Sequence, residues 1–250
     1  MKVRVQPKHR AVTLVITFAL WEIASIAAGS KYFPHSWVVL PDFLTLITTV
    51  NFWKDLVITL WLSLVSFILG AVIATIIGIT VALKHSGEIS TRGVLNFLRS
   101  IPSVVFLPLL IASIGSSART AIILSAFVVT FKLVTYIIRG IRQTEAGLLD
   151  SAEIMGLPLD KKIFLMYLPS TISIAGTGLR LSASRAFGTI IAAGIVAGTP
   201  GLGSALLMAE ANANYPRVFS YVVVMGITGA AIYAGFTALE RKLVVWRVSV

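Results

Sequence analysis

Six long apolar segments follow one another along this chain, and they restrict what it can fold into. They are residues 11–29, 55–83, 100–115, 118–138, 171–198 and 218–239. Because a helix needs about 20 apolar residues to cross a bilayer, the third segment is short, and the second and fifth are long enough to tilt. Only 12% of the 250 residues are charged, about half the fraction of a soluble domain. We therefore predict an all-α membrane protein with six transmembrane helices in one domain, 1–250.

The composition also excludes several classes of function. The chain has no cysteine, which excludes disulfides, thiol chemistry and cysteine-ligated metals. Its three histidines, His9, His35 and His85, are scattered outside the apolar segments and predict neither a metal site nor a catalytic triad. No GxxxxGK[ST] pattern is present, so the chain is not expected to bind ATP itself.

The net charge of +11 is compatible with nucleic-acid binding or with the positive-inside bias of a membrane protein, and the distribution of the charges decides between them. With the N-terminus inside, fourteen basic residues lie on the inner side: Lys2, Arg4, Lys8, Arg10, Lys84, Arg92, Arg99, Arg139, Arg142, Lys161, Lys162, Arg241, Lys242 and Arg247. Four lie on the outer side: Lys31, Lys54, Arg119 and Arg217. This asymmetry predicts a multi-pass protein with both termini in the cytoplasm.

The first apolar segment has a second interpretation as a cleaved signal peptide, because it follows a basic stretch and ends in small residues. Trp21 and Glu22 interrupt its apolar run, and an uncleaved anchor agrees with an even number of spans. We therefore expect 11–29 to remain as a transmembrane helix.

The stretch LLDSAEIMGLPLDKKIFLMYLPS, residues 148–170, is unusually polar for this chain and lies on the predicted inner side. Apolar residues recur in it at helical spacing and form one stripe: Leu148, Ala152, Met155, Leu159, Ile163 and Met166. Gly156 is suited to the left-handed turn that ends a helix, and Pro158 to the first turn of the next. We predict a helix, a tight turn, a second helix, and a break at Pro169 before the fifth span.

The charges of this stretch favour a protein partner. An amphipathic helix that lies on lipid usually has a strongly basic polar face, whereas this stretch has three acids, Asp150, Glu153 and Asp160, and two lysines. A cytosolic protein is therefore a better partner for it than an anionic membrane surface.

The same stretch resembles the EAA motif of ABC importer permeases. That motif is Glu-Ala-Ala, three residues, Gly, nine residues, Ile, one residue, Leu-Pro, and this chain has Asp150-Ser151-Ala152, Gly156, Met166 and Leu168-Pro169 at the same spacing. The substitutions are conservative. Further segments are similar to the nitrate/sulfonate/taurine subfamily: LPDFLTLI (40–47), FLRSIPSVVFLPLLIASIG (97–115), GTGLRLSASRA (176–186) and GTPGLGSAL (198–206).

The chain departs from this subfamily at two positions. An acid that is often present near Gly194 is missing, and Lys132 stands where a proline is frequent. Both departures concern the substrate rather than the class of protein.

The resemblance implies a type I ABC importer permease fold with a cytoplasmic coupling helix between the fourth and fifth spans. We call residues 148–166 the coupling segment. The residues implied to contact the ATPase or to shape that contact are Asp150, Ser151, Ala152, Glu153, Gly156, Leu157, Pro158, Leu168 and Pro169. The implied partners are two copies of an ABC ATPase that bind ATP and Mg²⁺, a second permease copy, an extracytoplasmic binding protein and the lipid of a bacterial inner membrane. The chain itself is expected to hold no cofactor.

Three basic residues, Lys132, Arg180 and Arg185, lie within predicted spans, where a charge costs about 2.5–3.5 kcal/mol on insertion scales. They can line a path for an anion, together with Ser184, or they can pair locally, for which Glu22 is one possible partner. Arg180 and Arg185 lie about 140° apart around a helix, so they cannot both face one narrow pore.

The fifth span is rich in small residues, which favour close helix packing and a dimer seam: Ser173, Ala175, Gly176, Gly178, Ser182, Ala183, Ser184, Ala186, Gly188, Ala192, Ala193 and Gly194. Residues 198–217 follow on the outer side, and their apolar run is too short to span. The resemblance places Gly201 and Gly203 there, at the outer gate below the binding protein.

These features favour the membrane subunit of an ABC importer for a small anion such as a sulfonate, taurine or nitrate. The alternative is a secondary transporter without an ATPase, which more often has intramembrane acids and two inverted halves; this chain has only Glu22 and no visible repeat. A membrane-embedded enzyme would need a catalytic cluster, which the sequence lacks. The importer-type motif is evidence against an ABC exporter.

Overall fold

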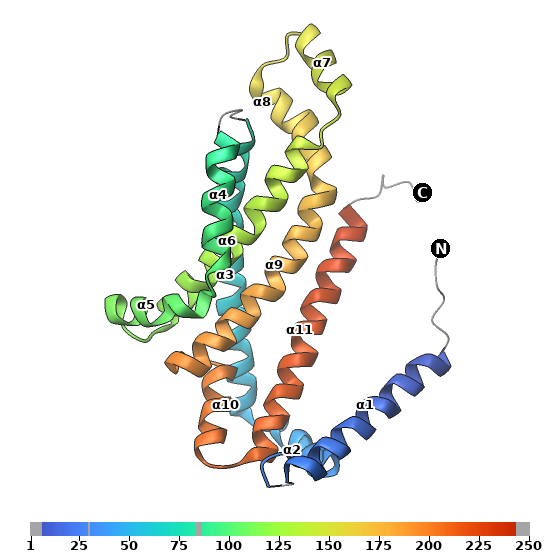
Figure 1. The fold of residues 1–250 in the computed structure, drawn as a ribbon, viewed down its shortest axis with the longest axis vertical. Coiled ribbons are helices and arrows are strands. Elements are labelled where there is room, and N and C mark those ends of the chain that lie inside the picture. The colour runs from blue at the N-terminus through green and yellow to red at the C-terminus, as the bar shows by residue number, and fades with distance from the viewer. Residues whose placement is uncertain (1–6, 30, 84–86, 244–250) are drawn as a thin grey trace.

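The computed structural model describes residues 7–29, 31–83 and 87–243, and this part of the chain is helical throughout (Figure 1). The α-helices are α1 (Pro7–Ala28), α2 (Ser36–Leu46), α3 (Val50–Leu83), α4 (Gly87–Ser100), α5 (Leu107–Ile114), α6 (Ala118–Arg142), α7 (Ala146–Ile154), α8 (Leu159–Lys162), α9 (Leu168–Ala197), α10 (Leu202–Ala211) and α11 (Tyr215–Leu243). Two short elements join them, a 3₁₀-helix η1 (Ser103–Phe106) and a π-helical turn η2 (Ile163–Tyr167).

Helices α3, α6 and α9 form the centre of the bundle, because small residues let their backbones approach closely. A Cβ at Gly70 of α3 would lie 2.7 Å from the Ala126 carbonyl oxygen of α6, and one at Gly178 of α9 would lie 2.6 Å from the Tyr136 Cβ of α6. The Thr130 hydroxyl donates to the Gly70 carbonyl over 3.2 Å. Close packing through small residues is thus confirmed at Gly178 of the fifth predicted span.

Four helical segments of the described chain are long and apolar enough to cross a membrane: Val50–Leu83, Ala118–Arg142, Ile174–Ala211 and Tyr215–Lys242. They correspond to the predicted spans 55–83, 118–138, 171–198 and 218–239. The first predicted span, 11–29, falls within α1, where Val15–Ala28 is a shorter apolar helix. The total of six spans therefore stays a prediction.

The third predicted span, 100–115, is not one continuous helix. Helix α4 ends at Ser100, the 3₁₀-helix follows Pro102, and α5 then runs across the long axis of the molecule (Figure 1). Pro102 lacks an N–H and disfavours helical geometry at Ile101. The apolar run thus bends at the proline, and α4, the 3₁₀-helix and α5 each contact α6 as separate elements.

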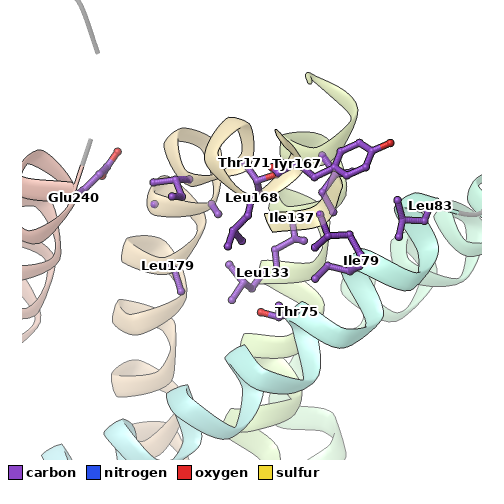
Figure 2. A pocket seen from close by; sticks show the side chains of 15 residues that line it. Thr75, Ile79, Leu83, Leu133, Ile137, Tyr167, Leu168, Thr171, Leu179 and Glu240 are labelled. Atoms are coloured by element: carbon purple, nitrogen blue, oxygen red, sulfur yellow. The ribbon is translucent and has the colours of Figure 1, made fainter. Parts of the chain in front are cut away.

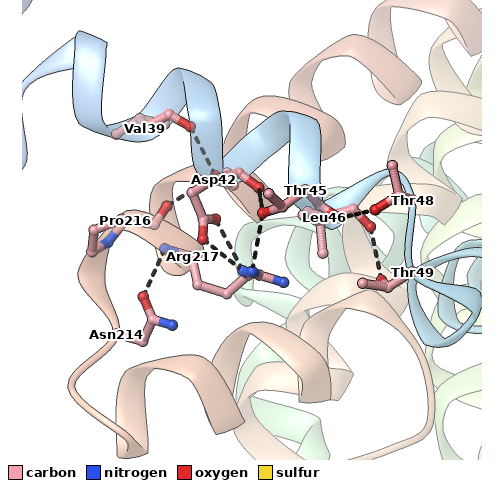
Figure 3. A network of polar contacts seen from close by, with 10 residues as sticks. Val39, Asp42, Thr45, Leu46, Thr48, Thr49, Asn214, Pro216 and Arg217 are labelled. Carbon is pink, nitrogen blue, oxygen red and sulfur yellow. Dashed lines mark hydrogen bonds and ion pairs between the residues drawn. The ribbon is translucent and has the colours of Figure 1, made fainter.

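At the end of the bundle opposite α7 and α8, α2 is fixed to the start of α11 by a polar network (Figure 3). The Arg217 Nε lies 2.9 and 3.1 Å from the two carboxylate oxygens of Asp42, and the Arg217 backbone N–H donates to the Asn214 side chain over 3.2 Å. The side chains of Arg217 and Asp42 are 26% and 16% exposed. This partly buried ion pair sets the position of α2.

Replacing Asp42 by Ala is expected to loosen α2 from α11, because Arg217 is left partly buried without its carboxylate. Losing a hydrogen-bonded partner of a charged group costs about 1.5–3 kcal/mol. The detergent-solubilised variant should unfold at a lower temperature than the wild type, whereas Glu210→Ala, at an exposed position of α10, should not. Equal unfolding temperatures for both variants would show that the pair does not hold α2.

Candidate coupling segment and cationic cavity

The first half of the coupling segment ends in a Schellman turn. Gly156 has φ = 64°, and the N–H groups of Gly156 and Leu157 donate to the carbonyls of Glu153 and Ala152, each over 3.0 Å. These two bonds satisfy carbonyls at the end of α7, and the left-handed residue strongly favours glycine. The left-handed geometry predicted for Gly156 is confirmed.

The second half does not break at Pro169, and that prediction was wrong. Pro158 precedes α8 as its N-cap, and from there the chain is helical through the π-helical turn into α9. The Leu168 N–H donates to the Ile163 carbonyl, five residues earlier. This wider turn lies directly before Pro169, which has no N–H to donate. The helix can therefore continue through the proline without a break. The coupling segment is therefore joined to α9 by a continuous helix.

The coupling segment projects past the end of α6 (Figure 1). Many of its apolar side chains are exposed. Leu148, Met155 and Leu159 of the predicted stripe are 45%, 70% and 57% exposed, whereas Ala152 is buried. Ile154, outside the stripe, is 88% exposed. The tight turn between α7 and α8 thus changes which residues share a face, and the segment presents a broad apolar surface instead of one stripe.

The acids of the segment are exposed as well. Asp150, Glu153 and Asp160 all lie on the surface, next to the exposed apolar side chains. An apolar surface bordered by carboxylates is typical of a contact site for another protein.

A cavity of about 460 Å³ lies where the coupling segment joins the bundle (Figure 2). Its walls are mostly apolar and include Ile79 of α3, Ile137 of α6, Tyr167 of the π-helical turn and Leu168 of α9, with Glu240 of α11 at its margin. Protein interiors are otherwise close-packed. The base of the coupling segment is therefore not closely packed against α3 and α6 at this point.

Arg180 is paired with α11. Its Nη1 lies 3.1 Å from the Glu240 Oε2 and 3.4 Å from the Thr237 hydroxyl, and its guanidinium lies 4.9 Å from the centre of the Tyr233 ring. Glu22, the partner considered from the sequence, is instead 2.7 Å from His35. These contacts support the local-pairing interpretation of Arg180.

The partner of Arg180 was missed because Glu240 lies one residue beyond the predicted sixth span, 218–239. The sequence signal that could have identified Glu240 as a partner is that it is an acid at the end of an apolar run. Ser184, the other residue considered near Arg180, donates to the Arg180 carbonyl over 3.4 Å and so bonds within its own helix.

Lys132 of α6 and Arg185 of α9 both line a second cavity, of about 370 Å³. Leu98 and residues 101–104 contribute to its wall, and the Lys132 Nζ lies 5.9 Å from the centre of the Tyr136 ring. Neither Arg180 nor Ser184 is among the described residues that line it. Lys132 and Arg185 thus line a cavity, whereas Arg180 forms an ion pair elsewhere. This agrees with the different directions predicted for Arg180 and Arg185.

Gly201 and Gly203 hold α10 against two other helices. Gly201 has φ = 127°, and the Leu202 N–H after it donates to the Thr59 hydroxyl over 2.9 Å. A Cβ at Gly203 would lie 2.9 Å from the Gly194 Cα, so only glycine permits this crossing of α9 and α10. These contacts are structural, and a role at an outer gate stays a prediction.

Long apolar helices, an exposed apolar and acidic segment at one end, and a cavity with two bases together define a membrane transport component. The chain matches, over residues 70–245, the family described as binding-protein-dependent transport system inner membrane component. The chain belongs to this family, and it is therefore an ABC importer permease subunit and not an enzyme by itself.

The relatives of the chain are similar over nearly its whole length. It is 24% identical over 236 residues to SsuC of Bacillus subtilis, a protein named as an aliphatic sulfonates transport permease, covering 94% of this chain and 86% of that one. It is 26% identical to the taurine transport system permease protein TauC of Escherichia coli, covering 96% and 92%.

Solved structures share its fold. A chain of the MetNI methionine ABC transporter superimposes with a TM-score of 0.68 at 17% identity and covers 77% of this chain and 95% of its own length. A chain of an amino acid ABC transporter does so with a TM-score of 0.64 at 15% identity, covering 80% and 96%. The predicted ABC importer permease fold is confirmed.

Proposed function

We propose that this chain is the membrane-spanning subunit of an ATP-driven importer of a small solute with an anionic group, such as a sulfonate, taurine or nitrate. Sulfonates, including taurine, are the class best supported. The observation that carries the proposal is the convergence of Lys132 and Arg185 on one cavity. Cationic side chains within a membrane are costly, and two that line one cavity are candidates for binding a ligand. The names of the relatives SsuC and TauC support a sulfonate in particular.

The proposed orientation places α7 and α8 in the cytoplasm, with both termini on the same side. Arg139, Arg142, Arg241 and Lys242 lie in the last turns of α6 and α11, the ends of these helices that lie toward α7 and α8 (Figure 1). Basic residues prefer the cytoplasmic side of a membrane. The end with α2 and α10 then faces an extracytoplasmic binding protein, and Gly201 and Gly203 lie near that face.

In the proposed assembly, two permease copies dock on two ATPase subunits, which bind the ATP and Mg²⁺; this chain holds no cofactor. The exposed apolar side chains of α7 would be buried in a groove of the ATPase, and its acids would pair with basic groups there. Because a helix joins the coupling segment to α9 without a break, closure of the ATPases would move α9, on which Arg185 lies.

The role of the two bases in transport follows from their charge. An anion that enters the cavity offsets the positive charge of Lys132 and Arg185, and an arginine can bind a sulfonate through two parallel hydrogen bonds. A solute without an anionic group would bring no negative charge to the cavity. The movement of α9 would separate Arg185 from Lys132, weaken this site and release the anion by alternating access.

Removing one charge tests this proposal. Lys132→Gln and Arg185→Gln are each expected to lower ATP-driven taurine uptake by about tenfold or more, since one charge-assisted hydrogen bond to the anion contributes about 1.4 kcal/mol or more. Uptake is measured in vesicles that contain the permease, its ATPase and its binding protein. Arg119→Gln, at an exposed position of the same helix α6 and outside the cavity, is the matched control and should transport normally.

Two results would contradict the proposal in different ways. If both Gln variants take up taurine at the wild-type rate, Lys132 and Arg185 do not lie on the transport path. A wild-type complex that transports neither taurine nor nitrate, but a solute without an anionic group, would overturn the substrate class.

A further inference from the structure

A third cavity, of about 390 Å³, lies between α4 and the end of α6, and we call it the inner cavity. Its polar lining comes from Asn96 of α4 and from Thr135, Arg139, Arg142 and Gln143 at the end of α6. Its lining therefore includes two arginines and two side-chain amides, which are hydrogen-bond donors. The Thr135 hydroxyl donates to the Phe131 carbonyl of its own helix over 3.5 Å.

The inner cavity lies along the same pair of helices as the cavity of Lys132. Arg139 follows Lys132 by seven residues, which is about two helical turns, so both side chains project from one face of α6, about 10 Å apart along its axis. Helix α4 lies against α6 and contributes a wall to both cavities, through Leu98 near Lys132 and Asn96 near Arg139.

The positive-inside rule alone explains why arginines stand at this end of α6, but it does not explain their surroundings. A residue that only anchors a helix extends toward the lipid headgroups. Arg139 and Arg142 instead line a cavity between two helices, and both remain exposed enough for a solute to reach them. Two arginines with amide donors beside them are suited to an oxyanion such as a sulfonate, carboxylate or phosphate.

We propose that the inner cavity is a second oxyanion site, which receives the transported anion after it leaves Lys132 and Arg185 and before it enters the cytoplasm. This inference rests on the proposed function, because it places the second site at the cytoplasmic end of the same transport path. Two sites in series let an anion leave the first without crossing a long apolar stretch, and multiple weak sites favour conduction over trapping. The headgroup of an anionic phospholipid has the same chemistry, so the experiment must separate the two sources.

The test uses the whole complex of permease, ATPase and binding protein, reconstituted in phosphatidylcholine vesicles. The double variant Arg139→Gln/Arg142→Gln is expected to lower taurine uptake at least about fivefold, while the complex assembles normally. Arg139→Lys/Arg142→Lys, which keeps the charge, should restore most of the uptake. Arg241→Gln/Lys242→Gln, which removes two charges in the last turn of α11 and outside the cavity, is the matched control and should transport normally.

A binding measurement on an otherwise intact site keeps the proposal testable if the double variant fails to assemble. The chain has no cysteine, so Asn96→Cys introduces its only thiol while leaving Arg139 and Arg142 in place. Taurine added at the cytoplasmic side should slow modification of this thiol by a methanethiosulfonate reagent. Taurine should not slow modification of the thiol in the control variant Lys242→Cys.

Each other outcome overturns the proposal and identifies the error. Unchanged uptake by Arg139→Gln/Arg142→Gln, with no protection of the Asn96→Cys thiol, would show that the inner cavity is not on the path. If the wild type requires phosphatidylglycerol and the double variant is defective only in its presence, the cavity binds a lipid headgroup. If the inner-cavity variants transport normally and Lys132→Gln does not, the proposed function stands and only the second site is refuted. If the wild type transports no oxyanion, both the proposed function and the second site are refuted.

Discussion

Replacing Gly156 by Val is expected to lower ATP-driven uptake about 5- to 150-fold while the protein still inserts into the membrane. Gly156 has φ = 64°, a geometry that costs a β-branched residue about 1–3 kcal/mol. The strain is released if the turn between α7 and α8 rearranges, which moves α7 away from the direction that Figure 1 shows. Uptake should fall at least about tenfold for each 1.4 kcal/mol by which the docked arrangement is disfavoured.

Gly156→Asn is the matched control, because asparagine tolerates left-handed geometry. A Cβ at Gly156 would meet no atom of the described residues within 4 Å, so the two variants differ in backbone strain and not in a steric clash. The asparagine variant should transport nearly normally. If the valine variant does so too, the angle of α7 is not important for transport.

Replacing Arg180 by Leu is expected to destabilise the contact between α9 and α11. Arg180 and Glu240 are 18% and 11% exposed, with 3.1 Å between Nη1 and Oε2, and removing one partner of a buried pair costs about 3–5 kcal/mol. The single variant should unfold at a lower temperature in detergent, and less of it should accumulate in the membrane.

The double variant Arg180→Leu/Glu240→Leu separates a structural role from a role in the path. It leaves neither charge of this pair behind, so most of the stability should return. Since Arg180 lies at the contact with α11 and not at the cavity of Lys132, taurine uptake should return as well. A double variant that is stable but does not transport would place Arg180 in the path after all.

The sequence predicted the coupling segment well where single residues decide the local geometry. The Gly156 turn was predictable because glycine is favoured in left-handed backbone, which ends α7 in this way. The continuity through Pro169 was not, because it depends on the wider turn at Ile163–Tyr167. Such a turn forms only where the surrounding packing accommodates the extra residue. No residue type in the sequence predicts it.

The charged residues show a similar limit. Helical geometry predicted that Arg180 and Arg185 point in different directions, and their different contacts agree. Which base would share a cavity with Lys132 depended on how α6 crosses α9, which is set by packing at positions such as Gly178. The wall of that cavity was missed because the bend at Pro102 was predicted as part of a span.

The central claim, that the coupling segment contacts the ATPase, is tested most directly by cross-linking from a single thiol. Because the chain has no cysteine, Glu153→Cys on the exposed face of α7 and Glu210→Cys on exposed α10 each provide a unique site. With a short cross-linker that has a maleimide at one end and a photoreactive diazirine at the other, we expect the permease to become linked to the ATPase from position 153. ATP should change the yield, and no such link should form from position 210. Absence of a link from position 153 in an actively transporting complex, or an equal yield from position 210, would contradict it.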